Sequence, residues 1–132
     1  MSANINAIFQ GILTIADETQ SNAPYIANID LENPTLAATQ VSNQPLVQVP
    51  TSPGVTIAPG FTMYLILIWN RSTTNEMQIN IAGVGGPGTQ ELGTVGPGAV
   101  VVLMDPSKSI GWSALSLTAQ GATVPATVVL AG

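Results

Sequence analysis

The stretch Phe61-Thr-Met-Tyr-Leu-Ile-Leu-Ile-Trp69 is the most apolar run in the chain, and it predicts a central β-strand. A helix is excluded because the run is short, rich in β-branched and aromatic residues, and bounded by a Pro-Gly pair and the polar segment 70–75. Strand side chains alternate sides, which gives two apolar faces, Met63, Leu65, Leu67 and Trp69 on one and Tyr64, Ile66 and Ile68 on the other. We therefore expect both faces to be buried.

Strand-like segments continue from this run to the C-terminus. The sequence Thr-Ile-Ala-Pro-Gly at 56–60 recurs as Thr-Val-Gly-Pro-Gly at 94–98, and residues 77–83 match residues 115–121 at the same offset of 38. An internal duplication explains this match, and so do two hairpins that follow common turn rules. Both explanations predict β-sheet, and residues 123–130 supply a last strand.

The first part of the chain predicts shorter elements. Residues 4–16 carry one strand kinked at Gly11 or two short strands, and residues 25–31 carry another strand. The Asn-Pro pair at 33–34 is a typical helix start, so residues 35–39 are expected to form a single helical turn.

About eight strands with no long helix, joined by Gly- and Pro-rich turns, indicate an all-β fold, an antiparallel β-sandwich of the jelly-roll or Greek-key type. An immunoglobulin-like topology stays open, although the Cys pair of antibody domains is absent. The strand at 44–49 is expected at a sheet edge, because Pro45 and Pro50 lack N–H donors. Residues 1–132 fit a single domain. The alternating apolar positions predict a buried core of Met63, Leu65, Leu67, Ile79, Ile81, Val100, Val102, Leu103, Leu117, Val128 and Leu130.

The composition is unusually poor in charge. Charged residues make up 7% of the chain, against about 25% in typical globular proteins, while 40 residues are Ser, Thr, Asn or Gln. Depletion of charge marks the core of protein–protein interfaces, so we expect much of the surface to be covered by copies of the chain or by partners. The net charge is −5, and only Arg71 and Lys108 are positive. Binding to nucleic acid or to an anionic membrane is therefore not expected.

The start of the chain and its apolar runs do not predict export or a membrane span. The N-terminal sequence has no basic segment followed by a long apolar one, so we expect synthesis in a cytoplasm without export. The longest apolar run is far below the roughly 20 residues that a membrane-spanning helix needs. The Asn-Arg-Ser sequon at 70–72 is therefore interpreted as part of a hairpin loop.

The sequence offers no catalytic, cofactor-binding or metal-binding residues, and we do not expect an enzyme. His and Cys are both absent, which removes the commonest base, the commonest nucleophile and the soft metal ligands. Asp17 and Glu18 are expected in a solvated loop, and Asp30 with Glu32 is too small a set for a calcium site. Residues 83–88 match G-x-G-x-x-G, but no helix follows them, so they are predicted to form a projecting loop.

The N-terminal segment is the first candidate for contacting a partner. Residues 1–9 are uncharged, have strand propensity and precede Gly11. They are predicted to be either a docking arm that adds as a strand to a neighbour or the first strand of the domain's own sheet. On the docking-arm hypothesis, Ile5, Ile8 and Phe9 contact the partner.

The aromatic residues are weighed between the core and a binding surface. Tyr64 and Trp69 are expected in the core, where aromatic side chains at separate elements are more common than in a sugar-binding platform. Trp112 lies in the polar loop 107–113. It is expected to be either an exposed contact residue or a buried side chain that closes this loop.

Three segments carry a family resemblance, namely Ile-Trp-Asn-Arg-Ser at 68–72, Thr-Val-Gly-Pro-Gly-Ala-Val-Val-Val at 94–102 and Ala-Thr-Val-Val-Leu-Ala-Gly at 126–132. They resemble the small structural proteins of tailed bacteriophages, in particular capsid decoration (cement) proteins with jelly-roll-like sandwiches. The resemblance covers the C-terminal half and transfers no functional residue. It implies a homotrimer that binds the major capsid protein, stiffens the shell and resides on the virion surface after synthesis in the host cytoplasm.

A second function from a different class is a receptor- or glycan-binding head or fibre module of a phage particle. That function predicts an exposed cluster of aromatic and carboxylate side chains in the loops at one end of the sandwich. Depletion of charge favours the cement protein.

Overall fold

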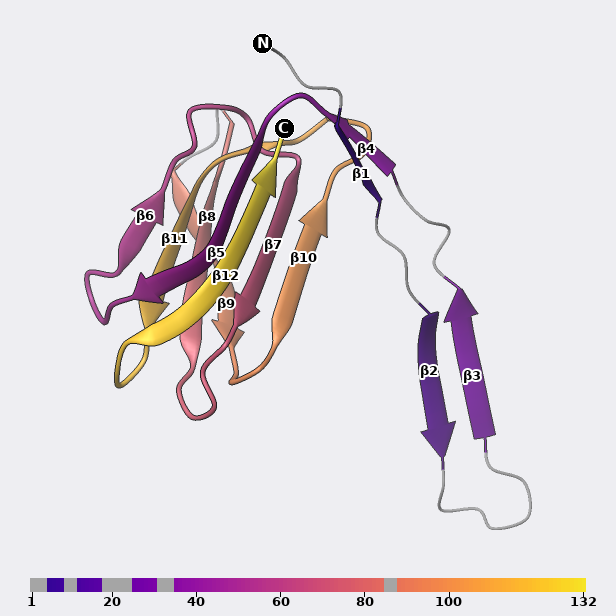
Figure 1. Cartoon of the computed structure of the whole chain (residues 1–132), viewed down its shortest axis with the longest axis horizontal. Coiled ribbons are helices and arrows are strands. Elements are labelled where there is room, and N and C mark those ends of the chain that lie inside the picture. The colour runs from indigo at the N-terminus through magenta and orange to yellow at the C-terminus, as the bar shows by residue number, and fades with distance from the viewer. Residues whose placement is uncertain (1–4, 9–11, 18–24, 31–34, 85–87) are drawn as a thin grey trace.

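The computed structural model describes residues 5–8, 12–17, 25–30, 35–84 and 88–132. Its strands are β1 (Ile5–Ile8), β2 (Ile12–Asp17), β3 (Tyr25–Asp30), β4 (Thr35–Ala38), β5 (Val41–Val49), β6 (Val55–Ile57), β7 (Leu65–Asn70), β8 (Met77–Gly83), β9 (Thr89–Val95), β10 (Val100–Met104), β11 (Trp112–Ala119) and β12 (Val124–Ala131). Two four-stranded antiparallel sheets, ordered β10-β7-β12-β5 and β6-β11-β8-β9, pack as a sandwich (Figure 1). The predicted all-β sandwich is thus confirmed.

The pairing of the strands is nested. β5 pairs with β12, β6 with β11, β7 with β10 and β8 with β9, each time antiparallel. The pairs alternate between the two sheets, with β5–β12 and β7–β10 in one and β6–β11 and β8–β9 in the other. This order differs from the immunoglobulin strand order.

The two segments that match at an offset of 38 residues lie against each other. β7 is the neighbour of β10, β8 is the neighbour of β11, and β6 and β9 form the two edges of one sheet. The prediction that both segments form sheet is confirmed. The alternative of two hairpins is wrong, because successive strands of each segment belong to different sheets, while an internal duplication stays a prediction.

The core lies between the inner faces of the two sheets. One sheet contributes Ile66, Ile68, Val124, Ala126, Val128 and Leu130, and the other contributes Met77, Ile79, Leu115 and Leu117, all of them fully buried. Of the predicted core, Met63, Ile79, Leu117, Val128 and Leu130 are buried, whereas Leu65, Leu67, Ile81, Val102 and Leu103 are only partly so and Val100 is 56% exposed.

The prediction that both faces of the central apolar run are buried is wrong. β7 does lie inside its sheet, between β10 and β12, and Ile66 and Ile68 of its inner face are fully buried. Trp69 on the opposite face is 42% exposed, because a two-layer sandwich covers only one side of each antiparallel sheet. The expectation that Trp69 belongs to the core is wrong for the same reason, while Tyr64 is half-buried.

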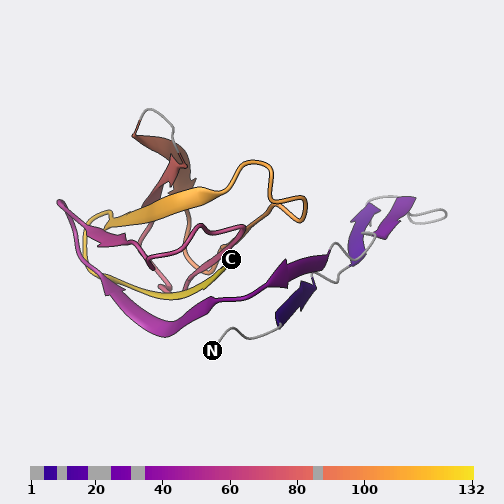
Figure 2. The same ribbon diagram turned by 90° about the horizontal axis from the view of Figure 1, so that it is seen from above.

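The N-terminal strands form two separate pairs, of which only the β2–β3 hairpin stands apart from the sandwich. β1 pairs with β4 in a two-stranded ribbon, and β2 pairs with β3 in a hairpin. Both views show this hairpin clear of the two sheets, beyond the ribbon (Figures 1 and 2). Residues 4–16 thus contain two short strands, and the strand expected at 25–31 is present as β3.

The helical turn expected at residues 35–39 is wrong, because Thr35–Ala38 is strand β4. Leu36 and Ala38 alternate with exposed neighbours and are buried against Ala131. Pairing with β1 and this packing stabilise the strand, which local helix-start signals do not reveal. The prediction that residues 44–49 form an edge strand is confirmed, since β5 ends the order of its sheet.

Candidate interaction surface

The outer face of the sheet β10-β7-β12-β5 is apolar. The strand register sets Val100, Trp69 and Thr127 side by side in one row across three strands. A second row consists of Val102, Leu67 and Val129. Trp69 and Val100 are 42% and 56% exposed, and the other four are partly buried. We call these six residues, none of them charged, the open half of the outer face.

The β1–β4 ribbon covers the other half of the same face. Leu36 and Ala38 of β4 are 0% and 2% exposed and form a small core with Ala131, which is 1% exposed. Leu65 and Met104, the next row of outward residues, pack against this small core together with Tyr64. The outer face therefore has a covered half and an open half, with continuous apolar surface between them.

A rigid loop borders the open half at Arg71. The Asn70 side chain is fully buried, and its Nδ2 lies within hydrogen-bonding distance of the carbonyl oxygens of Asn75, Val95 and Gly96, at 3.0, 3.1 and 3.0 Å. Its Oδ1 accepts the Ser72 N–H at 2.9 Å. The sequon is thus closed to glycosylation in the folded chain, and its Asn ties the β7–β8 loop to the β9–β10 turn. This loop connects strands of different sheets, so the expected hairpin loop is a crossover.

Arg71 places a positive charge at the border of the open half. Its guanidinium carbon lies 5.0 Å from the centroid of the Trp69 ring, a cation–π arrangement. From the sequence, Trp69 is expected in the core. The signal for its exposure is Arg71, because residues two positions apart along a strand point to the same side and a charged residue marks the side that faces solvent.

The four predicted contact residues are not brought together. Ile5 and Ile8 bound strand β1, which pairs with β4, and Phe9 lies outside the described residues. Trp112 begins β11, packs half-buried against the core and exchanges two main-chain hydrogen bonds with Met63, at 2.7 and 2.8 Å. Its role is closer to the side chain that closes the loop than to an exposed contact residue.

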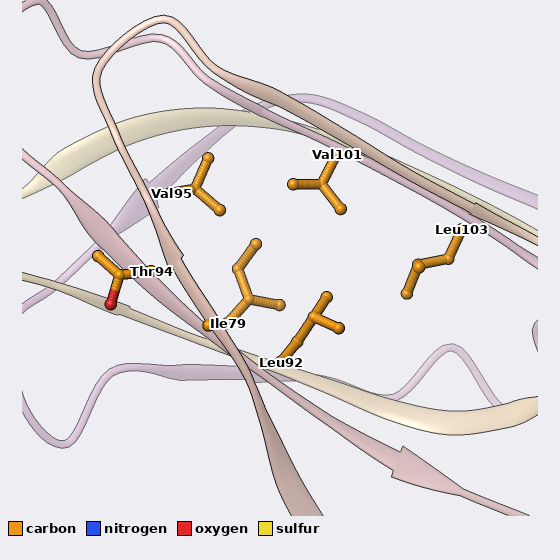
Figure 3. Close-up of a pocket in the computed structure, with 7 residues that line it drawn as sticks. Ile79, Leu92, Thr94, Val95, Val101 and Leu103 are labelled. Atoms are coloured by element: carbon orange, nitrogen blue, oxygen red, sulfur yellow. The ribbon is translucent and has the colours of Figure 1, made fainter.

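An apolar cavity of about 180 Å³ opens between β9 and β10, the edge strands of the two sheets (Figure 3). Its lining consists of Ile79, Leu92, Gly93, Thr94, Val95, Val101 and Leu103. It is smaller than the roughly 300–1,000 Å³ of typical small-molecule sites, and its lining holds no ionisable group. The cavity therefore offers no chemistry for a reaction.

The carboxylate of Asp105 is held by its own loop. Its oxygens accept the Ile110 N–H and the Ser107 Oγ–H, each at 2.7 Å, and lie 3.5 Å from the Ser109 Oγ. The Ile110 N–H, followed by the Ser107 hydroxyl, lowers the pKa of Asp105 below its usual value of 3.8. The nearby Lys108 ammonium lies 5.5 Å from the centroid of the Tyr64 ring. Carboxylate and ring are thus both engaged at this end of the sandwich.

Other kinds of site were sought in the described part of the chain. Within it, no three His, Cys, Asp or Glu residues come together as metal ligands. Asp30 ends β3, and Glu32 lies outside the described residues. No helix of the described residues is long and apolar enough to cross a membrane. Comparison of the chain with protein-family models, with curated proteins and with solved structures finds no match.

Proposed function

We propose that this chain is a non-enzymatic structural protein of a bacteriophage virion, which decorates the capsid and stabilises it by binding the lattice of the major capsid protein as a homo-oligomer. The observation that carries the proposal is the apolar, uncharged open half of the outer face. Soluble monomers rarely leave contiguous apolar surface of more than a few hundred Å² uncovered. A surface of this composition is typical of the centre of a protein–protein interface.

The fold and the sequence support this choice of partner. The nested strand pairs of this chain, which alternate between the two sheets, resemble those of jelly rolls, and jelly rolls are among the folds of viral capsid proteins. Three segments of the chain also resemble phage cement proteins. A fold alone does not define a function. The resemblance therefore supplies the capsid as partner and the trimer as the favoured oligomer, while the open half supplies the need for a partner.

The proposal also accounts for the poverty of charge. A protein held on a shell by many identical contacts keeps much of its surface away from water, so it needs few charged side chains for solubility. Only nine of the 132 residues are charged, two of them positive. Closed symmetric oligomers repeat one interface many times, which makes an apolar patch a regular feature of each copy.

The receptor- or glycan-binding alternative needs an exposed aromatic ring beside a free carboxylate. Among the described residues, exposed Trp69 stacks with the cation of Arg71. Asp105 lies near Tyr64, but its carboxylate is bound by its own loop and the ring is covered by Lys108. These contacts favour the decoration protein over the binding head.

Immunogold labelling tests the proposed function. Antibodies against the sandwich are applied to negatively stained phage particles from the lysate in which the chain is produced. We expect gold at regular positions over the whole capsid surface. Gold confined to the tail tip or fibres would support the binding head instead, and a chain that does not co-purify with particles would refute both virion functions.

A further inference from the structure

We propose that the β2–β3 hairpin of one copy docks on the open half of the outer face of a second copy. This inference rests on the proposed function for the oligomer, and it goes beyond that function by naming both surfaces of the contact. Neighbouring subunits are then linked by hairpins that each copy gives to the next.

One face of the hairpin has two apolar cross-strand pairs. The register sets Leu13 opposite Ile29 and Ile15 opposite Ala27, with Asp17 opposite Tyr25 at one end of the same face, because directly opposed positions of an antiparallel pair share a face. An isolated two-stranded hairpin is marginally stable at best in water, because it has no layer to pack against. This hairpin stands clear of both sheets of its own chain (Figures 1 and 2). It therefore requires another apolar surface.

The open half offers a matching surface. It lies mainly on β7 and β12, whose main-chain groups are paired on both sides within the sheet. On β7 and β12 a partner therefore meets side chains and not a free strand edge, so the proposed contact is the packing of one layer on another. β10, which carries Val100 and Val102, is an edge strand. Layers of sheet pack about 10 Å apart through interlocking aliphatic and aromatic side chains. Trp69 and Val100 are the most exposed side chains there.

The molecule already shows a two-stranded ribbon on this face. The β1–β4 ribbon covers the other half, where it buries Leu36, Ala38 and Ala131 almost completely. The apolar surface runs without a charged residue from this covered half into the rows of Leu67 and Trp69. The β2–β3 hairpin of another copy, placed beside the β1–β4 ribbon, would continue the packing of ribbon on sheet that the β1–β4 ribbon already makes on the covered half.

The hairpin on the open half comes from another copy of the chain. The hairpin leaves the β1–β4 ribbon on the side away from the sandwich (Figure 2), so its apolar face and the open half of the same chain lie apart. A rotated neighbour brings them together, and each copy then gives one hairpin and receives one. Contacts of this head-to-tail kind close into rings such as trimers. Asp17 lies at one end of the hairpin face that carries Leu13 and Ile15, and Arg71, of opposite charge, borders the receiving face. Asp30 lies at the other end of the hairpin and on its other face.

Disulfide trapping tests the contact directly, because the chain contains no Cys. A tagged Ile15→Cys variant is mixed with untagged Val100→Cys or Thr127→Cys, the two ends of the row that contains Trp69. The partners are allowed to exchange and are then oxidised. We expect a tagged–untagged disulfide dimer with at least one of the two, since a disulfide requires Cβ atoms about 3.5–4.5 Å apart. Val84→Cys, which directly follows β8 of the other sheet and is similarly exposed at 52% against 56% for Val100, should give none.

A charge on the receiving face provides the second measurement. Val100→Glu is expected to raise the dissociation constant of the oligomer at least tenfold, whereas Val84→Glu should leave it unchanged. Thermal melts of both variants establish that they fold. An unchanged oligomer with Val100→Glu would overturn the inference. So would a disulfide between two copies of Val100→Cys in place of the mixed product, or a disulfide within single chains of the double Cys variant.

Both measurements use the purified protein without capsids. If the mixed disulfide forms but the immunogold antibodies do not label capsids, the proposed function is refuted and the hairpin contact stands. If the antibodies label capsids but no mixed disulfide forms, only the hairpin contact is refuted.

Discussion

Replacing Asn70 by Ala is expected to lower the free energy of unfolding by about 3–5 kcal/mol. Two of the hydrogen bonds of this side chain, to the Val95 carbonyl and from the Ser72 N–H, are buried. Leaving a buried polar group unpaired costs about 1–3 kcal/mol, and a partly buried bond contributes about 0.5–1.5 kcal/mol. The bonds to Asn75 and Gly96 are of the second kind. The four contributions add to about 3–9 kcal/mol, and we expect the lower part of this range because single substitutions rarely cost more than about 5 kcal/mol.

Asn70→Asp separates the hydrogen bonds from packing. Aspartate has almost the same shape as Asn but donates no hydrogen bond, and its negative charge would face the carbonyl oxygens of Asn75, Val95 and Gly96. We expect this variant to lose at least as much stability as the Ala variant at neutral pH. If loss of volume were the cause, Asn70→Asp would instead resemble the wild type.

Urea denaturation followed by tryptophan fluorescence measures both variants, since Trp69 is the adjacent residue. Protein concentration is held constant, because self-association contributes to apparent stability. Gln90→Ala, which removes an exposed amide side chain of β9 in the other sheet, serves as the control and should lie within about 0.5 kcal/mol of the wild type. A loss below about 1 kcal/mol for Asn70→Ala would refute the reasoning.

Two further changes probe the ribbon and the loop of Asp105. Leu36→Ala removes a fully buried side chain from the β1–β4 ribbon, a loss of about 2–5 kcal/mol, and we expect thermolysin to cut before residue 40 while the fragment 41–132 stays intact by mass spectrometry. Cleavage throughout the sandwich would contradict a separable ribbon. The pKa of Asp105 is lowered in the folded chain, so its charged form stabilises the fold at any pH above its usual pKa of 3.8. This stabilisation is lost as the pH falls through the lowered pKa. Asp105→Asn should therefore show a weaker acid dependence of its urea midpoint, and an unchanged dependence would exclude this role.

Much of the fold could be predicted from the sequence because its signals are local. Apolar alternation and Pro-Gly turns located the strands of the second half, and Pro45 and Pro50 placed β5 at an edge. The same signals misassigned Trp69 and residues 35–39. Alternation shows which side chains share a face, but whether a second layer covers that face depends on segments distant in the sequence.

The candidate surface could be predicted less well. Depletion of charge indicated an interface, yet the open half appears only when β7, β10 and β12 are aligned in register. Val100 and Leu67 looked like core residues for this reason. The buried contacts of Asn70 join segments 25 and 26 residues apart, and no local pattern predicts them.

Sedimentation equilibrium of the purified full-length chain tests the central claim, that the open half of the outer face is covered by another copy in solution. The account predicts one closed oligomer, with the trimer favoured at three times the 13.5 kDa mass of the chain, and its dissociation by Val100→Glu but not by Val84→Glu. A wild-type chain that sediments as a 13.5 kDa monomer at every concentration would contradict it.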